Sequence, residues 1–411
     1  MRTEKINVGL CFGGEAPIIE VGELILKNKQ IHFKYSSSFT QKGFNLSPLK
    51  LPFNTQIQSG NPKLFDGLFG LFYDSLPDNW GKLLLDRAML SKGINTNQLN
   101  PLDRLSLVGL KGAGALVYHP CPENTQITNK KIQLDKIANE TKSIISGASS
   151  SIIEALYELG GSSGGARPKI QLGFNKITQE LIYPTNELPN GFEHWLIKFP
   201  SSFDLPDIAN IEFAYYLMAK DAGIEISESK LFTGKSNEVY FATKRFDRIG
   251  NKRLHLHSAS GLLHDDFEKS QLDYGHLMDA VFQLERNENS YRKILRLAAF
   301  NLYSHNRDDH SKNFSFLMAE NGEWEFAPAY DLTFSSSSHG YHSTLIGGES
   351  LNPNKSHLLE LASVFGVRNT TEIIEEVKEV IRNWTKYANN AGVSSQSKKK
   401  IKLVVDKLIL T

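Results

Sequence analysis

The chain has 411 residues, 40% hydrophobic and 22% charged, with a formal net charge of +1, which is typical of a folded protein of two or three domains. The near-neutral charge argues against a chain-wide surface for nucleic acid, and two cysteines are too few for a disulfide framework or a metal cluster. No run approaches 18 apolar residues and the N-terminus lacks signal-peptide features, so we expect a cytoplasmic protein that crosses no membrane.

The first part of the chain predicts strands and then helices. A hairpin turn is expected at Lys27-Asn28. In the segment DSLPDNWG, residues 74–81, Pro77 can begin a turn, and Asp78 or Asn79 can cap the following helix. The expected elements, in chain order, are strands within residues 5–35, helical spacing over 64–90, a Gly-interrupted apolar element at 105–118 and a polar boundary at 120–141.

The second part alternates strands with longer helices. Apolar residues recur at helical spacing over residues 208–222, and Asn321-Gly322 is a strong hairpin signal. The expected elements are a helix at 150–159, strands at 169–174, 180–183 and 193–199, a helix at 208–222, a strand at 238–246, a helix at 291–306, a hairpin at 314–326 and a mostly helical tail from 357. This mixture predicts the α+β class.

The strongest functional signal is NRDDHSKNF, residues 306–314, followed by YDLT at 330–333. Phosphoryl transfer by a kinase-type site needs a carboxylate that receives the substrate proton, and an amide and a second carboxylate that hold Mg²⁺ on the ATP phosphates. Asp308 stands five residues before Asn313, as in the kinase pattern H-R-D-x-x-x-x-N, and Asp331 follows one hairpin later. We therefore predict Asp308 as the catalytic base, with Asn313 and Asp331 as magnesium ligands.

Two neighbours in this segment have alternative interpretations. Lys312 is a candidate for neutralising the transferring phosphate, or else a solvated surface lysine. Asp309 adjoins the base but is expected to point elsewhere, toward solvent or as a helix cap.

Lys198 stands in WLIKFP, inside a run that predicts a buried strand, and a buried lysine is costly unless it is paired. The helix that follows carries Glu212 beside its apolar stripe. A strand lysine that binds ATP phosphates and is held by a helix glutamate is the kinase arrangement. The alternative is a lysine at a strand end and a solvated glutamate.

GGSSGGARPK, residues 160–169, is a candidate phosphate loop, because glycine lets backbone N–H groups approach phosphate oxygens closely. Ser163, Gly164 and Gly165 are its predicted nucleotide-binding residues. The loop fits neither common phosphate-loop pattern, so a flexible helix-to-strand connection is the alternative.

These segments, with KRFDR at 244–248, APAYDLT at 327–333, DSLPDNWG and GALVYHP at 114–120, resemble the HipA family of bacterial Ser/Thr kinases, the toxins of type II toxin–antitoxin systems. The resemblance implies an α+β, bilobal fold related to protein and phosphoinositide kinases, with an extra N-terminal α+β domain. It implies an N-terminal domain at 1–120, a lobe with the Gly-rich loop and ATP lysine at 145–245, and a mainly helical lobe at 246–411.

The resemblance also extends the predicted site. It places Lys244 and Phe246 at the adenine-binding hinge and Asp247 near the ribose, and it gives ATP and Mg²⁺ as cofactors. Family members autophosphorylate a serine of the Gly-rich loop, which implies Ser162, with Ser163 as the alternative. Where the family often has glycine after the catalytic acid, this chain has Asp309.

The function implied is that of a growth-arresting serine/threonine kinase that phosphorylates a translation component such as an aminoacyl-tRNA synthetase. The implied partner is a small helix-turn-helix antitoxin (HipB-like), with operator DNA reached only through that complex. Two alternatives stay open: a nucleotide-binding corepressor with little kinase activity, and a small-molecule or lipid kinase on the same scaffold.

Overall fold

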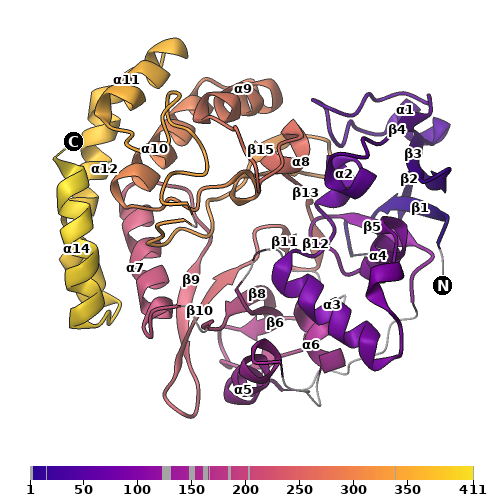
Figure 1. Cartoon of the computed structure of the whole chain (residues 1–411), viewed down its shortest axis with the longest axis horizontal. Helices are drawn as coiled ribbons and strands as arrows, with labels where there is room; N and C mark the ends of the chain where they lie inside the picture. Colours follow the sequence, from indigo (N-terminus) through magenta and orange to yellow (C-terminus); the bar gives the residue numbers. More distant parts are fainter. Residues whose placement is uncertain are drawn as a thin grey trace. The chain divides into compact units, whose positions relative to one another are not determined.

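The computed structural model describes residues 3–14, 16–122, 131–147, 153–160, 165, 167–183, 187–201, 204–337 and 339–410. The chain divides into two compact units (Figure 1). Unit 1 comprises Met1–Ser202, Phe232–His257 and Leu317–Gly322, and unit 2 comprises Phe203–Leu231, Ser258–Phe316 and Glu323–Thr411. Each unit is described by itself below.

The first sheet of unit 1 is antiparallel, in the order β4-β3-β2-β1-β5. Lys27 of β2 pairs with Gln30 of β3, and the two residues between them, Asn28 and Lys29, have φ values of 52° and 63°. Positive φ at both central residues is the geometry that matches strand twist in a two-residue hairpin, so the predicted hairpin is confirmed, with its turn one residue later than predicted. The strands are β1 (Lys5–Leu10), β2 (Ile19–Lys27), β3 (Gln30–Tyr35), β4 (Gln58–Ser59) and β5 (Leu116–His119).

Short helices accompany this sheet. The predicted element at 105–118 is in fact the end of a helix and the start of a strand, separated by Gly109 and Gly114, whose φ values are 52° and 69°. Asn100 and Asp103 form a capping box at the start of the helix, with Pro101 in its first turn. The helices are α1 (Ser37–Lys42), η1 (Phe65–Gly67), α2 (Gly70–Tyr73), α3 (Asn79–Ser91), η2 (Thr96–Gln98) and α4 (Pro101–Val108).

The second sheet of unit 1 has the order β7-β6-β8-β10-β9. One core cluster joins this sheet to helices α3, α5 and α6 through buried residues such as Trp80, Ile137, Leu156 and Trp195. Helix α5 overlaps residues 120–141, so the expectation of a non-periodic boundary there is wrong for 134–141. The elements are α5 (Leu134–Ile145), α6 (Ile153–Gly160), β6 (Lys169–Asn175), β7 (Leu181–Ile182), β8 (Phe192–Lys198), β9 (Ser229–Thr233) and β10 (Val239–Lys244).

After β10 come the short strands β11 (Arg248–Ile249), β12 (Lys252–Arg253) and β13 (His255–Ser258). The strands β11 and β12 pair with each other, and the backbone N–H of Arg253 donates to the carbonyl of Phe12 at 2.7 Å. The end of β12 is thus hydrogen-bonded to the chain just beyond β1, within unit 1.

Unit 2 is mainly helical. The buried ring of Tyr215 packs edge-to-face against Phe300 and Trp384, so residues of three helices share one aromatic core. The predicted hairpin around Asn321-Gly322 is confirmed by β14 and β15, although its residues Leu317–Gly322 belong to unit 1. The elements are α7 (Ile208–Asp221), α8 (Ala259–Leu263), α9 (Tyr274–Glu285), α10 (Asn289–Tyr303), η3 (Ser311–Asn313), β14 (Ser315–Met318), β15 (Trp324–Phe326), α11 (Lys355–Val364), α12 (Thr370–Arg382), α13 (Trp384–Asn390) and α14 (Ser395–Ile409).

Among the described residues, no helix has the length and apolar character needed to cross a membrane.

Candidate functional site

The predicted base and one predicted magnesium ligand meet in a tight loop that follows α10. The side chain of Asn313 donates from Nδ2 to the backbone carbonyl of Asp308 at 2.6 Å. The backbone N–H of Asn313 donates to the carbonyl of His310 at 2.8 Å. The side chain of Asp308 is exposed. Since the amide nitrogen of Asn313 closes the loop, its Oδ1 is the atom that can ligate a hard cation.

The segment that carries Asp331 is tied to the same loop. The hydroxyl of Tyr330 donates to the carbonyl of Lys312 at 2.6 Å and lies 2.6 Å from Ser315 Oγ. Asp331 itself has φ of 54°, which is uncommon for a residue other than glycine and concentrates at functional sites. The structure therefore brings the chain segments of all three predicted residues together within unit 2.

A second set of contacts holds the other end of the loop. Ser335 accepts from the N–H of Arg307 at 2.9 Å and donates its own N–H to His305 at 3.0 Å, so the two segments run as a parallel bridge. The loop is thus fixed to residues 330–335 on both sides of Asp308.

Asp309 is 1% exposed, and the expectation that it faces solvent or caps a helix is wrong. Its carboxylate accepts from the hydroxyl of Tyr274 at 2.9 Å and from the N–H groups of Ser343 and Thr344 at 2.9 and 3.3 Å. His342 Nδ1 lies 3.0 Å from Oδ2. The extra charge beside the predicted base therefore anchors the loop from within the core.

Lys312 is half-buried, with its Nζ 4.7 Å from the ring centre of Phe267. The ring of His310 packs on the same phenylalanine at 5.5 Å. A cation over an aromatic face is stabilised at this distance. The role of Lys312 toward phosphate stays a prediction.

Unit 1 holds the predicted ATP lysine at the end of β8. Lys198 is buried and pairs in register with Lys169, the first residue of β6, which is also buried. Residues opposite each other on antiparallel strands project from the same face of the sheet. Two buried cationic side chains therefore project from one face of this sheet.

Glu212 is buried on α7, in unit 2. Its predicted pairing with Lys198 stays a prediction. In the Gly-rich segment, Ser162, Ser163 and Gly164 lie outside the described residues, whereas Gly165 is described, with φ of 86°.

The predicted hinge residues have partners within unit 1. Lys244 pairs with Glu193 at 2.5 Å. The Asp247 carboxylate, 5% exposed, accepts from Arg245, Arg248 and the N–H of Gly114. Burial opposes its ionisation, but the two guanidinium groups hold its pKa well below the usual range. We therefore give Asp247 a structural role and do not carry it forward as a ribose contact. Phe246 stays a hinge prediction.

The structure also shows a buried polar set that the sequence did not indicate. His257 Nδ1 lies 2.6 Å from Asp74 Oδ2, and Nε2 lies 2.9 Å from Ser47 Oγ. The order of atoms is that of a serine-hydrolase triad. Ser47 is 1% exposed, however, so no substrate can reach its hydroxyl, and the set cross-links three distant segments instead.

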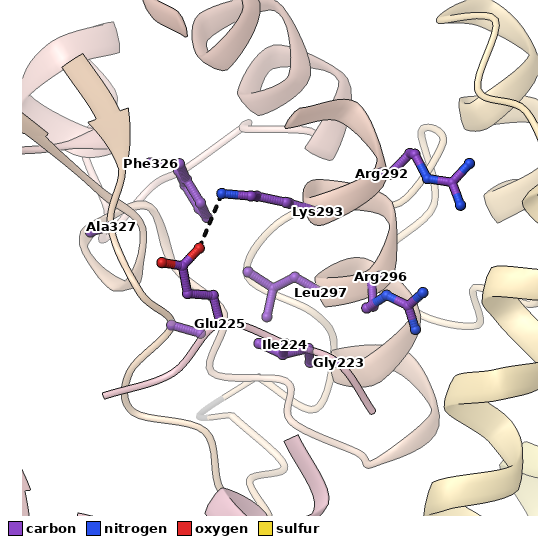
Figure 2. Close-up of a pocket in the computed structure, with 10 residues that line it drawn as sticks. Gly223, Ile224, Glu225, Arg292, Lys293, Arg296, Leu297, Phe326 and Ala327 are labelled. Carbon is purple, nitrogen blue, oxygen red and sulfur yellow. Dashed lines mark hydrogen bonds and ion pairs between the residues drawn. The ribbon is translucent and has the colours of Figure 1, made fainter. Parts of the chain in front are cut away.

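A pocket of about 230 Å³ in unit 2 contains none of the predicted site residues. Figure 2 shows Lys293 of α10 reaching toward Glu225, and the two charges are 3.0 Å apart. Arg296, on the same helix, donates to the carbonyl of Ala222 and pairs with Glu376. Lys293 and Glu225 are bound to each other and Arg296 to groups outside the lining, so we assign the pocket no chemistry.

No group of three or more His, Cys, Asp or Glu suited to a metal occurs among the described residues. Mg²⁺ is commonly held by one or two protein ligands together with substrate phosphates and water, and Asn313 and Asp331 provide one amide and one carboxylate oxygen.

Comparison with known families covers both parts of the chain. Residues 161–384 match the HipA-like C-terminal domain, and residues 17–119 match the HipA N-terminal domain. The chain belongs to the HipA family.

A curated relative from Haemophilus influenzae, described as a candidate kinase, is 30% identical over 187 residues, which are 42% of this chain and 52% of that protein. The chain thus spans about half the length of this relative. Among solved structures, HipA of Shewanella oneidensis, determined with HipB and operator DNA, is similar at a TM-score of 0.66 and 17% identity, over 98% of this chain and 96% of that one. The Helicobacter pylori proinflammatory kinase CtkA has a TM-score of 0.36 and 17% identity, over 54% of this chain and 87% of its own.

The Shewanella match shows the fold. This HipA-family chain has a mixed α+β, kinase-like fold with an additional N-terminal domain, as the sequence predicted.

Proposed function

We propose that this HipA-family chain is an ATP-dependent kinase that phosphorylates a serine or threonine hydroxyl of a protein and acts as the growth-arresting toxin of a type II toxin–antitoxin pair. The observation that carries the proposal is the loop closed by Asn313 on Asp308 and tied through Tyr330 to the segment of Asp331. These are the groups, in the order, that kinase chemistry requires.

In the proposed mechanism Asp308 accepts the proton of the acceptor hydroxyl. Its exposed carboxylate suits this role, because an acceptor protein must approach it from solvent. Asn313 Oδ1 and the Asp331 carboxylate would hold the magnesium ion. Magnesium-bound ATP would supply the phosphoryl group and neutralise charge that develops in the transition state. Lys312 would leave the ring of Phe267 to approach the transferred group.

Unit 1 would contribute the phosphate-binding cation. Lys198 lies on a face of the second sheet that also carries Lys169, and the positive charge of the two ammonium groups would attract the phosphates of ATP. Autophosphorylation at Ser162, or at Ser163, would add negative charge to the Gly-rich segment and so oppose phosphate binding. This would make the segment a self-inactivating switch.

We further propose a small helix-turn-helix antitoxin of the HipB type as the partner. The Shewanella relative was determined with HipB and operator DNA. The net charge of +1 supports contact with operator DNA through the antitoxin rather than through an extensive surface of this chain. A component of translation, such as an aminoacyl-tRNA synthetase, is the proposed acceptor.

The test is the intact mass of the purified, dephosphorylated chain after incubation with ATP and Mg²⁺, with peptide mapping. We expect one added phosphate on the peptide that contains Ser162 and Ser163. Asp308→Ala should abolish it. Asp279→Ala, which removes an exposed acid of α9 in the same unit, should leave it unchanged.

A wild-type chain that binds ATP but gains no phosphate, and that transfers none to a protein extract of a host cell, would contradict the proposal. It would favour a nucleotide-binding corepressor or a small-molecule or lipid kinase. An Asp308→Ala variant as active as wild type would remove that residue from its assigned role.

A further inference from the structure

The acid before helix α3 does not cap its own helix. Asp78 occupies the N-cap position, yet its side chain makes no capping hydrogen bond. Its Oδ2 instead accepts the N–H of Gly165, 87 residues further along the chain, at 3.0 Å. An N-cap aspartate usually satisfies a free N–H of its own first turn. Here it satisfies a backbone group of the Gly-rich segment.

The first turn of α3 holds the same glycine from its other side. The N–H of Trp80, one of the donors that a helix start leaves without an intrahelical partner, donates to the carbonyl of Gly165 at 3.3 Å. Gly165 is thus held through both its donor and its acceptor. Each of the two peptide groups that flank the Cα of Gly165 is therefore held by one hydrogen bond.

Trp80 extends these contacts to the strand that follows. Its indole N–H donates to the carbonyl of Lys169, the first residue of β6, at 2.9 Å. The tryptophan ring is buried in the core cluster with Leu84 and Ile170, so it cannot turn away without opening that core. Residues 165 and 169 are therefore held by one rigid helix end.

The side chain of Lys169 lies against the glycine. A Cβ built on Gly165 would stand 2.5 Å from Lys169 Nζ, and the φ of 86° at Gly165 is in the region that favours glycine. Lys169 pairs in register with Lys198. The helix start thus fixes the end of the Gly-rich segment beside one of the two buried lysines of this face.

We propose that Asp78 and Trp80 are positioning residues for nucleotide binding: they hold Gly165 and Lys169 in the orientation that receives ATP phosphates. This inference rests on the proposed kinase function and deepens it. All of these residues lie within unit 1. The DSLPDNWG segment would act by preorganisation, because a site that is ordered before binding does not lose the same conformational entropy when the ligand arrives.

The experiment compares variants of the full-length chain. Asp78→Ala removes the acceptor for Gly165, whereas Asp78→Asn keeps an acceptor oxygen of the same reach. Trp80→Phe keeps a buried ring and removes the indole donor to Lys169. Asp86→Ala is the matched control, because Asp86 is an acid of the same helix that pairs with Arg104, at 3.4 Å. Thermal melting establishes that each variant is folded.

Two readouts are needed. Amide hydrogen exchange of the peptide spanning 161–170, without nucleotide, measures whether Asp78 and Trp80 order this segment. Calorimetric titration with Mg·ATP, together with KM and kcat for autophosphorylation, measures whether that order affects ATP binding. For Asp78→Ala we expect faster exchange in this peptide, a Kd about tenfold weaker, equivalent to about 1.4 kcal/mol, and a raised KM. Asp78→Asn and Asp86→Ala should stay near wild type, and Trp80→Phe should move in the direction of Asp78→Ala.

Unchanged exchange in Asp78→Ala would overturn the inference, and so would faster exchange with equal or tighter ATP binding. If Asp78→Ala does not fold, Trp80→Phe decides by the same two readouts. The two proposals fail differently. A wild-type chain that binds no ATP overturns the proposed function and this inference with it, whereas a wild type that binds ATP beside an Asp78→Ala variant of equal affinity overturns this inference alone.

Discussion

Substitution of the adjacent acids Asp308 and Asp309 should affect the stability of the protein differently. Asp308 is exposed, whereas Asp309 is buried and accepts hydrogen bonds from Tyr274, Ser343 and Thr344. The change to test is Asp309→Ala, with Asp308→Ala as its matched control. The first removes an internal anchor, and the second removes a group in contact with solvent.

The expected loss for Asp309→Ala follows from the donors left behind. Each buried donor that loses its acceptor costs about 1–3 kcal/mol. The hydroxyl of Tyr274 also accepts from Asn301 at 2.8 Å, so part of the network persists after the substitution. Removing one partner of a buried charged network typically costs about 3–5 kcal/mol. At about 2–4 °C per kcal/mol for a domain of this size, the Tm should fall by about 10 °C.

Thermal melting and the phosphorylation assay together decide the outcome. Asp308→Ala should melt within about 0.5 kcal/mol of wild type, as surface substitutions do, and should be inactive. Asp309→Ala should melt early and also lose activity, because the segment that carries Asp308 is no longer held. Asp309→Asn keeps one acceptor oxygen and should fall between. A Tm for Asp309→Ala within 2 °C (about 1 kcal/mol) of wild type would refute the reasoning.

Three further predictions concern stability. Burial lowers the pKa of His194 and of His255 to about 3, so the unfolded chain binds protons before the folded chain as the pH falls below 6.5. The free energy of unfolding should therefore fall by about 1.4 kcal/mol per histidine for each pH unit below that value. A urea midpoint that stays constant from pH 7 to pH 5 would contradict this. Asp247→Asn removes the negative charge between two buried guanidinium groups and should lower the free energy of unfolding by about 3–5 kcal/mol, which is measured as a lower Tm. A decrease under about 1 kcal/mol, the size expected of a surface ion pair, would show that the network is not essential for stability. Burial and the nearby Glu225 raise the pKa of Glu325, so the ionised form is disfavoured in the folded state. Glu325→Gln should therefore raise the Tm at pH 7 and not at pH 4. Equal shifts of the Tm at both pH values would exclude the electrostatic cause.

Local signals in the sequence predicted local structure well. The hairpin at Asn321-Gly322 formed where expected, and the turn after β2 formed one residue later than predicted, at Asn28-Lys29. The loop from Asp308 to Asn313 is equally local, since the bond that closes it joins residues five apart. Candidate site residues that lie close together in one short segment can therefore be recognised from the sequence before the tertiary structure around them is known.

Two helices, α5 and α9, are not among the elements that the sequence predicts, for different reasons. Residues 134–141 lie in helix α5 although the segment before them is polar and lacks periodicity. Helix α9 was not anticipated, although Asp273 caps it and Leu277, Met278 and Val281 follow at helical spacing on its buried side. In α5 the helical spacing of apolar residues is obscured by the polar stretch that precedes it. In α9 the capping residue and the helical spacing are both present in the sequence.

The two acids that departed from expectation share a physical cause. From the sequence, Asp78 is a helix cap and Asp309 a solvated residue or a cap, which are the local roles of aspartate. A cap contributes about 1 kcal/mol, whereas a hydrogen bond from a buried donor to a charged acceptor contributes about 1.5–3 kcal/mol. Where folding brings a buried or part-buried donor within reach, the distant partner outweighs the local one. The part-buried N–H of Gly165 is that partner for Asp78, and the buried hydroxyl of Tyr274, 35 residues away, is one such partner for Asp309. Neither donor is close to the acid in the sequence. A prediction from neighbouring residues alone therefore assigns each aspartate the weaker, local hydrogen bond, where the tertiary structure provides a stronger one.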